Sequence, residues 1–234
     1  MSMPWTHGLI ALGAAGIAAL AIACGDDAEN AATDTPTPTT AQPTAEATVT
    51  NDCPEPTGEA PEAIVKTYDS APEMTIDLEK SYTAVVRTER GDFTMTLRPD
   101  LADQHVNSFV FLARDGYYDG VTFHRVLPGF VAQAGDPTGT GSGSPGYSIP
   151  AEFTDQVSFT GGVVGAARGL DVDSAGSQWF VTLADASSLN GQYTVFAQVT
   201  EGMDVVQCLT ARDPRVNPGA PPGDKIISID ITEA

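Results

Sequence analysis

Two apolar runs joined by a turn signal occupy residues 121–134 and contain a single cation, Arg125. Pro128-Gly129 separates the runs and favours a tight turn, so a hairpin of two short strands is expected here. Side chains alternate in direction along a strand, which predicts that Phe123 and Arg125 point the same way. The plain interpretation is a surface hairpin with an ordinary charge. However, an arginine among residues that normally line a core needs a reason, because an unpaired buried charge is costly.

The rest of the chain contains many short extended segments and two helical ones. An apolar stripe with spacing i, i+3, i+4 and i+7 predicts an amphipathic helix over residues 103–114, and a second short helix is expected over 203–209. Alternation along the last strand predicts that Ile227, Ile229 and Ile231 share one face. This pattern indicates a mainly β fold, a closed antiparallel barrel. The predicted strands are residues 82–87, 93–97, 122–126, 130–134, 162–167, 179–183, 194–199 and 225–232.

The charge balance is strongly acidic, with 31 Asp and Glu against 11 Lys and Arg and a formal net charge of −20. Nucleic-acid binding requires basic patches, so this balance argues against nucleic acid as a partner. Residues 141–146 match G-x-G-x-x-G, but the residues after them will not start a helix, so no dinucleotide site is expected. The Cys and His residues do not have metal-ligand spacing, and we expect neither a metal nor a cofactor.

Residues 8–23 form an uncharged run of small and apolar residues, shorter than the roughly 20 that a membrane-spanning helix needs. The run ends in Ala21-Ile22-Ala23-Cys24, which resembles the lipobox of bacterial lipoproteins. We therefore expect a signal peptide over residues 1–23 and lipidation of Cys24, which would anchor the protein on a membrane outside the cytoplasm. No Lys or Arg precedes the run, and Leu20 lies one place further from the cysteine than usual. Plain secretion and an uncleaved anchor therefore remain alternatives.

Residues 24–62 are rich in Thr, Pro, Ala and acidic residues and contain little to bury. This composition predicts a disordered, extended linker that holds the domain of residues 63–234 away from the membrane. An accidental low-complexity segment fits the composition equally well. If Cys24 carries lipid, Cys53 and Cys208 remain, and in an oxidising compartment they form either a disulfide or two free thiols.

A longer pattern in the chain resembles a known family. Residues 123–130 read FHRVLPGF, Gln133-Ala134-Gly135-Asp136 and a glycine-rich segment follow, and residues 175–180 continue as AGSQWF. Together they closely resemble the signature of cyclophilin-type peptidyl-prolyl cis-trans isomerases, and the resemblance covers roughly residues 82–232. It implies a closed eight-stranded antiparallel β-barrel capped by two α-helices.

The activity that the resemblance implies needs no covalent chemistry. An X–Pro bond isomerises over tens to hundreds of seconds, because amide resonance sets a barrier of roughly 20 kcal/mol. A cation beside the imide nitrogen stabilises the twisted bond more than the planar one, and this is catalysis by differential binding. Arg125 suits this role, because its guanidinium stays protonated and presents several donors.

The resemblance also assigns roles to individual residues. It implies that Arg125 and Gln133 are catalytic, with Gln133 donating a hydrogen bond to a substrate carbonyl. The backbone of Ala167 and Arg168 would pair with the peptide as an added strand. His124 should face away from Arg125 and is interpreted as structural or exposed. The remaining residues would form an apolar cup for the proline or line the groove: Phe130, Val131, Gly141, Gln178, Phe180, Leu189 and Tyr193.

We therefore expect a membrane-tethered, monomeric isomerase that acts on X–Pro segments of unfolded or exported proteins. The alternative is a non-catalytic proline-peptide-binding module or chaperone on the cell surface. Arg125, Phe130, Gln133 and Phe180 occur together in this chain, and their joint presence favours the enzyme.

Overall fold

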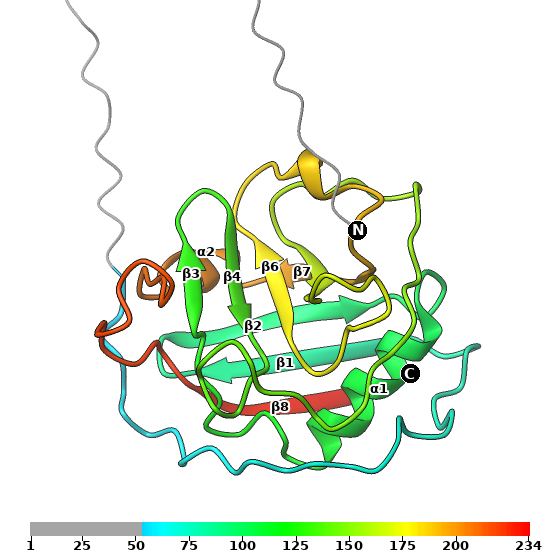
Figure 1. Ribbon diagram of the computed structural model, residues 1–234, viewed down its shortest axis with the longest axis horizontal. Coiled ribbons are helices and arrows are strands. Elements are labelled where there is room, and N and C mark those ends of the chain that lie inside the picture. The colour runs from blue at the N-terminus through cyan, green and yellow to red at the C-terminus, as the bar shows by residue number, and fades with distance from the viewer. Residues whose placement is uncertain (1–52) are drawn as a thin grey trace, which may run out of the picture. The chain divides into compact units, whose positions relative to one another are not determined.

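The structure, a computed structural model, describes residues 53–234 and shows one eight-stranded antiparallel sheet with two α-helices. The strand order is β3-β4-β6-β5-β7-β2-β1-β8 (Figure 1). Every predicted strand is present, with ends that differ by a few residues. The predicted signal peptide, Cys24 and most of the predicted linker lie outside the described residues. The strands are β1 (Tyr82–Thr88), β2 (Gly91–Leu97), β3 (Arg125–Leu127), β4 (Val131–Ala134), β5 (Val163–Ala166), β6 (Trp179–Thr182), β7 (Val195–Glu201) and β8 (Ile226–Glu233).

The prediction of a closed barrel is wrong, because the sheet stays open between its edge strands, β3 and β8. The segments that lead into these strands meet in an isolated bridge between Thr122 and Lys225, not in a ladder. The outer edge of β3 is occupied by the loop before β8, where Val126 and Arg212 exchange backbone hydrogen bonds of 2.7 and 2.9 Å. Proline cannot donate to a ladder, so this loop does not form a closing strand. Its prolines are Pro214, Pro218, Pro221 and Pro222.

Two α-helices pack against the sheet. Helix α1 (Asp103–Arg114) occupies the residues predicted for it and contacts β7 and β8, while α2 (Met203–Gln207) is shorter than predicted and contacts β2. A short 3-10 helix, η1 (Ser187–Leu189), precedes β7. None of the helices in the described part of the chain has the length and hydrophobicity to cross a membrane. The predicted apolar stripe of α1 is buried: Val106, Phe109, Val110 and Ala113.

Alternating side chains of the central strands build two separate apolar clusters, one on each face of the sheet. In β6, Trp179 and Val181 enter the main core, whereas Phe180 between them belongs to a smaller cluster. Strand β4 behaves in the same way, since Val131 lies in the smaller cluster and Ala132 in the main core. The same short strands therefore support the core with one face and leave the other face free to form a site.

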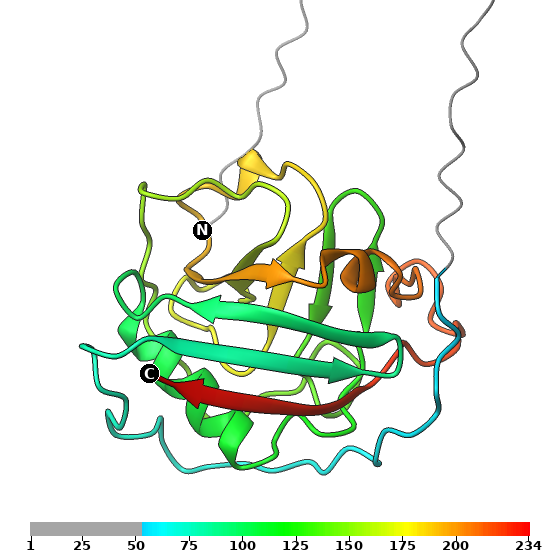
Figure 2. The ribbon, with the colours of Figure 1, turned by 180° about the vertical axis from the view of Figure 1, so that it is seen from behind.

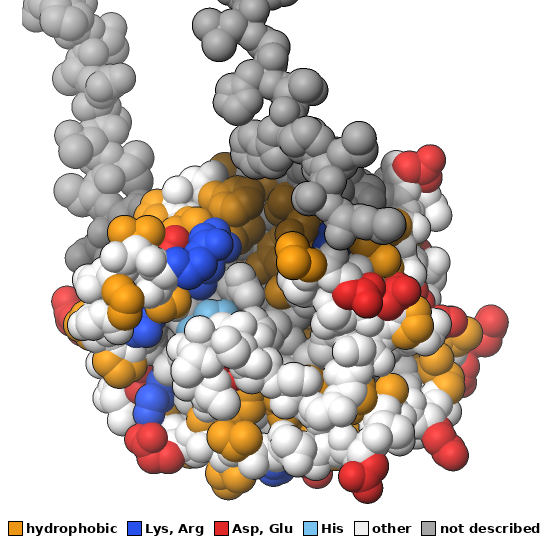
Figure 3. Space-filling view, in the orientation of Figure 1, with side chains coloured by type: hydrophobic (Ala, Val, Ile, Leu, Met, Phe, Trp, Pro, Cys, Tyr) orange, Lys and Arg blue, Asp and Glu red, His pale blue; other side chains and the backbone are white. Residues whose placement is uncertain are grey.

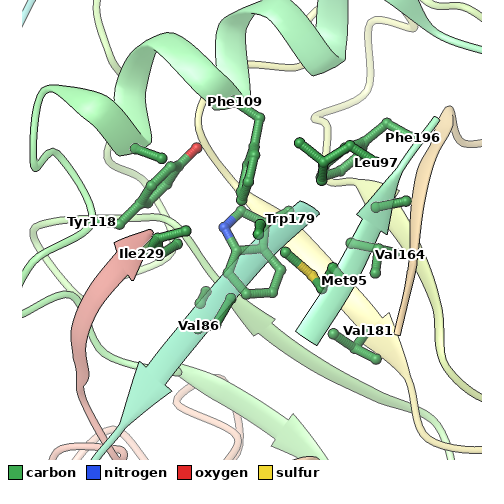
Figure 4. Packing of buried hydrophobic residues seen from close by; sticks show 14 of the residues in the cluster. Val86, Met95, Leu97, Phe109, Tyr118, Val164, Trp179, Val181, Phe196 and Ile229 are labelled. Carbon is green, nitrogen blue, oxygen red and sulfur yellow. The ribbon is translucent and has the colours of Figure 1, made fainter. Parts of the chain in front are cut away.

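The indole of Trp179 lies at the centre of the main core (Figure 4). It meets the rings of Phe109 from α1, Tyr118 and Phe123 nearly at right angles, with ring centroids 6.1, 6.5 and 5.7 Å apart. Edge-to-face pairs of this kind add to the stabilisation that comes from burial. They join helix α1 to the sheet that carries the smaller cluster.

Phe123 and Arg125 do not point the same way, so that prediction is wrong. Phe123 is fully buried in the main core, whereas the side chain of Arg125 is half-buried on the other face. The strand begins only at Arg125, and the Phe123 N–H donates to the carbonyl of Asp224 at 2.9 Å. Strict alternation therefore does not extend back to Phe123.

The last strand also departs from simple alternation. Thr88 pairs with Ile226 and Arg87 with Ser228, which leaves Ile227 as the extra residue of a bulge. Ile226 is fully buried and Ile229 is also in the core, whereas Ile227 is only partly buried. Because of the bulge, Ile226 and not Ile227 faces the core at the start of β8.

Residues 53–81, which we call the strap, run along the outside of the domain before β1 (cyan in Figures 1 and 2). A disulfide joins Cys53 to Cys208, just after α2. The Thr57 N–H donates to the carbonyl of Glu89 at 2.9 Å. The predicted linker reached residue 62, but from Cys53 onward the chain is attached to the domain.

Tyr68 fastens the middle of the strap. Its hydroxyl donates to the Asp115 carboxylate at 2.7 Å, and its ring lies edge-on to Phe111 with centroids 5.2 Å apart. Burial, together with the hydrogen bond to Asp115, raises the pKa of the Tyr68 hydroxyl. The Tyr68 N–H donates to the carbonyl of Pro145 at 2.8 Å, so the strap also contacts the end of the glycine-rich segment.

Asn107 of α1 anchors the end of the strap. Its Oδ1 accepts from the N–H groups of Thr75 and Ile76 at 2.9 and 3.3 Å, and its Nδ2 donates to the carbonyl of Glu73 at 2.9 Å. The side chain is buried, so water does not replace these partners.

Replacement of Asn107 should therefore loosen the strap. In Asn107→Ala the N–H groups of Thr75 and Ile76 lose their acceptor, and we expect the free energy of unfolding to fall by about 1–3 kcal/mol. Chemical unfolding followed by tryptophan fluorescence measures this change. Gln104→Ala, on the exposed side of the same helix, is the matched control and should change stability by less than about 0.5 kcal/mol. Equal stability of Asn107→Ala and the wild type would contradict the anchoring role.

Candidate active site

Strand register places three predicted site residues in one row on the face of the smaller cluster. Arg125 of β3 lies opposite Gln133 of β4, and Gln133 lies opposite Phe180 of β6. The row continues into β5, where Gly165 lies opposite Phe180. Directly paired residues on neighbouring strands point to the same face, so register alone brings the cation, the amide and the ring together.

This row borders a hollow of about 100 Å³ lined mainly by apolar and aromatic residues, which we call the apolar cup. The Phe180 and Tyr193 rings meet in it at 89°, with centroids 5.5 Å apart. Figure 3 shows the hollow with a hydrophobic floor and Lys or Arg side chains at one edge. The cup brings together nine of the predicted residues: Arg125, Phe130, Val131, Gln133, Ala167, Arg168, Phe180, Leu189 and Tyr193.

Gly165 leaves room for the two aromatic rings that pack beneath the cup. A Cβ atom at this position would lie 2.5 Å from Cζ of Phe180 and 2.8 Å from Cε1 of Phe159. The rings of Phe159 and Phe180 stack with centroids 5.6 Å apart, directly over the glycine. A glycine inside a strand often marks such a close approach, so this residue could have been noticed in the sequence.

Arg125 stands half-buried at the edge of the cup, and its buried Nε has no hydrogen-bond partner among residues 53–234. Its guanidinium carbon lies 5.9 Å from the centroid of the Phe130 ring. Burial and the nearby charge of Arg215 lower the pKa of Arg125, while Asp213 and Tyr193 oppose the shift. The group stays protonated at neutral pH, because an arginine pKa starts above about 12.

A chain of amide hydrogen bonds holds Gln133. Its Nε2 donates to Oε1 of Gln178 at 2.9 Å, and Nε2 of Gln178 donates to the carbonyls of Gly141 and Gly143 at 3.1 and 2.9 Å. One N–H of Gln133 therefore remains for another acceptor, because a primary amide carries two. The glycine-rich segment thus positions Gln133 through Gln178.

A second hollow of about 290 Å³ adjoins the cup, and we call it the polar pocket. It shares Gln133, Ala167 and Arg168 with the cup, and the rest of its lining is mainly Gly and Ser. The two remaining predicted groove residues, Gly141 and Gln178, line this pocket. All predicted groove residues therefore lie in two adjoining hollows on one face.

Asp136 shapes the wall of the polar pocket. Its buried carboxylate accepts from the N–H groups of Thr138, Gly141 and Gly143 at 2.7, 2.6 and 3.0 Å. Burial alone raises the pKa of Asp136, but the Thr138 hydroxyl, which donates to Oδ1 at 2.7 Å, and these N–H donors outweigh it and hold the pKa below the ordinary range. A Cβ at Gly143 would lie 1.8 Å from Oδ1, so only glycine lets the segment wrap so closely around the carboxylate.

Sequence reasoning missed three residues that complete the site: Gly165, Phe159 and Asp136. Asp136 belongs to the signature, but no local pattern shows that its carboxylate gathers N–H groups up to seven residues away. His124 is 2% exposed and does not line the cup, in keeping with a structural role. Within residues 53–234, no group of three or more His, Cys, Asp or Glu side chains is placed to hold a metal ion.

Comparison with known proteins decides the family. A sequence model of the family described as "Cyclophilin type peptidyl-prolyl cis-trans isomerase/CLD" matches residues 83–231. The chain belongs to the cyclophilin-type peptidyl-prolyl cis-trans isomerase family. It is therefore an isomerase, and the cup and the polar pocket described above are parts of a cyclophilin fold.

Its relatives include bacterial isomerases. It is 40% identical over 161 residues to a "Probable peptidyl-prolyl cis-trans isomerase" of Brucella suis, which covers 64% of this chain and 82% of the relative. It is 38% identical over 153 residues to a peptidyl-prolyl cis-trans isomerase of Helicobacter pylori, covering 64% and 91%. A crystal structure of a Cryptosporidium parvum cyclophilin-type isomerase is similar with a TM-score of 0.59 and 26% identity, covering 65% of this chain and 98% of that one.

The packing over Gly165 leads to a test of the cup. In Gly165→Ala the added methyl group must displace the Phe180 ring, and such overpacking should cost about 1–3 kcal/mol of unfolding free energy. Because Phe180 would move toward the cup, we also expect the KM for X–Pro peptides to rise. Gly161→Ala is the matched control, because its Cβ would meet no atom closer than 3.8 Å. Unchanged stability and KM in Gly165→Ala would contradict the role of this glycine.

Proposed function

We propose that Arg125 accelerates X–Pro isomerisation by stabilising the twisted imide bond. When the bond twists, its nitrogen loses amide resonance and regains a lone pair, so a nearby N–H donor favours the twisted state over the planar one. The observation that carries the proposal is the buried Nε of Arg125, which has no partner among residues 53–234 and lies beside the apolar cup. A donor that is unpaired before substrate arrives needs no rearrangement to act on it.

The other groove residues would bind and orient the peptide. The proline ring would occupy the apolar cup against Phe180, and the second N–H of Gln133 would donate to a substrate carbonyl. The carbonyl of Ala167 and the N–H of Arg168 have no hydrogen-bond partners in the described part of the chain, so they can pair with an added strand. A Cryptosporidium parvum cyclophilin of 26% identity and TM-score 0.56 was solved in the presence of the dipeptide Ala-Pro, which supports a proline-containing ligand.

The clients on this proposal are X–Pro segments of exported proteins. The support is the sequence before the domain: an uncharged apolar run over residues 8–23, then Cys24, then a Thr- and Pro-rich acidic segment. The protein would be a monomeric lipoprotein that is cleaved before Cys24 and tethered outside the cytoplasm. The disulfide between Cys53 and Cys208 is in keeping with an oxidising compartment.

Replacement of Arg125 tests the mechanism. Arg125→Ala should lower kcat/KM by about 10²–10³-fold, the scale of one preorganised donor, with little change in unfolding free energy. Arg125→Lys should recover little of the activity, because an ammonium group does not reproduce the planar donor set. A protease-coupled or NMR exchange assay on a short X–Pro peptide measures the rates.

The matched control is Arg87→Ala, which removes an exposed arginine of β1 that is paired with Asp230 at 3.0 Å. Its kcat/KM should equal that of the wild type, since Arg87 lines neither hollow. Near-wild-type turnover in folded Arg125→Ala would refute the Arg-assisted mechanism. An unmodified protein that bound X–Pro peptides without turnover would instead support a non-catalytic binding module.

The proposed anchor has its own test. Protein extracted from cells should lack residues 1–23 and carry acyl mass on Cys24 in intact-mass spectrometry, and it should partition into the detergent phase. Cys24→Ser should be uncleaved or should lose the acyl mass and the partitioning. A mature terminus elsewhere, without acyl mass, would exclude the lipoprotein and leave secretion or an uncleaved anchor.

A further inference from the structure

The pairing of charges sets the groove apart from the rest of the surface. All 11 Lys and Arg residues lie within residues 53–234, and eight of them form ion pairs with Asp or Glu. The three cations without a carboxylate partner in this range are Arg125, Arg168 and Arg212. Two of these three line the apolar cup. Although the chain has a net charge of −20, Arg125 and Arg168 therefore place two positive charges without carboxylate partners at the apolar cup.

Arg212 lines neither hollow, and backbone carbonyls bind its Nε and Nη1. Its Nε donates to the carbonyl of His124 at 3.0 Å, and its Nη1 donates to those of Ala220 and Pro221. These bonds hold the loop before β8 against the segment that leads into β3. Its role is structural.

Arg168 is held in place without being neutralised. Its Nε donates to the carbonyl of Gln192 and its Nη1 to that of Gly169, both at 2.9 Å. Its guanidinium carbon lies 4.9 Å from the centroid of the Tyr193 ring. Its Nη2 has no acceptor among the residues that the structure describes. The result is a positioned cation with a free donor, since carbonyls and an aromatic ring orient a guanidinium but leave its charge intact.

The position of Arg168 places that donor beside a bound proline. Arg168 lines both the apolar cup and the polar pocket, so a peptide that runs from one to the other passes it. Arg125 lies near the Phe130 ring and Arg168 near the Tyr193 ring, and both rings line the cup. No Asp or Glu of the described chain lines either hollow. Among residues 53–234 Arg168 therefore has no carboxylate partner, and an acidic residue of the substrate would supply one.

We infer that Arg168 makes this cyclophilin select peptides with an acidic residue directly beside the proline. The inference rests on the proposed binding of the proline in the apolar cup. The overall negative charge of the chain repels acidic peptides, but at 0.1 M salt this repulsion is screened beyond about 10 Å. A carboxylate in contact with Arg168 is screened much less, so the local attraction decides the preference.

The test compares kcat/KM for peptides that differ only in charge beside the proline. One pair contains Glu-Pro or Gln-Pro, the other Pro-Glu or Pro-Gln, and two-dimensional NMR exchange spectroscopy measures cis–trans exchange without a coupling protease. The proteins are the wild type, Arg168→Gln, Arg168→Lys and the control Arg87→Gln. The control removes one positive charge from outside the groove, so it reports the effect of net charge alone.

In the wild type, kcat/KM for the Glu peptide should exceed that for the Gln peptide by about 1.5- to 5-fold in one of the two pairs, the range of partly exposed ion pairs. The pair that shows the preference tells which neighbour of the proline contacts Arg168. In Arg168→Gln the ratio should fall to one or below, because only the general repulsion remains. Arg168→Lys should give an intermediate ratio, and Arg87→Gln the wild-type ratio.

A Glu-to-Gln ratio of one or less in both wild-type pairs would overturn the inference. A preference that survives in Arg168→Gln would also overturn it, since another group would then be responsible. A general loss of groove structure in a variant lowers both members of a pair and does not by itself move the ratio. If the wild type accelerates none of the four peptides, the proposed function fails as well; if it accelerates the Gln peptides without favouring Glu, only the inference about Arg168 fails.

Discussion

The alternation of side chains along β4, β5 and β6 is the constraint on which both the core and the groove depend. These strands are only four residues each, and each contributes to the main core and to the smaller cluster. In β6, Trp179 fills the centre of the core while the next residue, Phe180, forms the floor of the apolar cup. A shift of register by one residue would therefore exchange core and site, so packing around Trp179 also determines where Phe180 points.

At two positions in the groove a glycine, which has no side chain, lets other atoms pack closely against the backbone. Gly165 lets two phenylalanine rings lie over β5, and Gly143 lets the glycine-rich segment wrap around the Asp136 carboxylate. The same segment presents carbonyls that hold Gln178, and Gln178 in turn holds Gln133. The buried Asp136 carboxylate does not line the cup, but it holds the glycine-rich segment in place. The carbonyls of that segment then position Gln133 through Gln178.

One feature of this chain, the strap, lies outside the family match at residues 83–231. The strap attaches residues 53–81 to the domain through the disulfide, Tyr68 and Asn107. Through Pro145 it also contacts the end of the segment that lines the polar pocket. A second feature is the distribution of charge. Ion pairs with Asp or Glu neutralise every cation outside the groove except Arg212, and the two other unpaired arginines, Arg125 and Arg168, line the apolar cup.

The sequence alone determined the elements and most of the site. Periodicity located all eight strands and both helices, and the resemblance named eleven residues that the structure places in the lining of the two hollows, because hydrophobic spacing and signature residues are local properties of the chain. Tertiary structure decided the rest. The sheet stays open because a proline-rich loop occupies the edge of β3, the bulge at Ile227 exchanges the residue that faces the core, and Phe123 leaves the face of Arg125 because the strand starts later. The carboxylate of Asp136 and the free donor of Arg168 likewise depend on partners brought together only by folding. Such features follow from contacts between distant segments, which no local pattern of residues specifies.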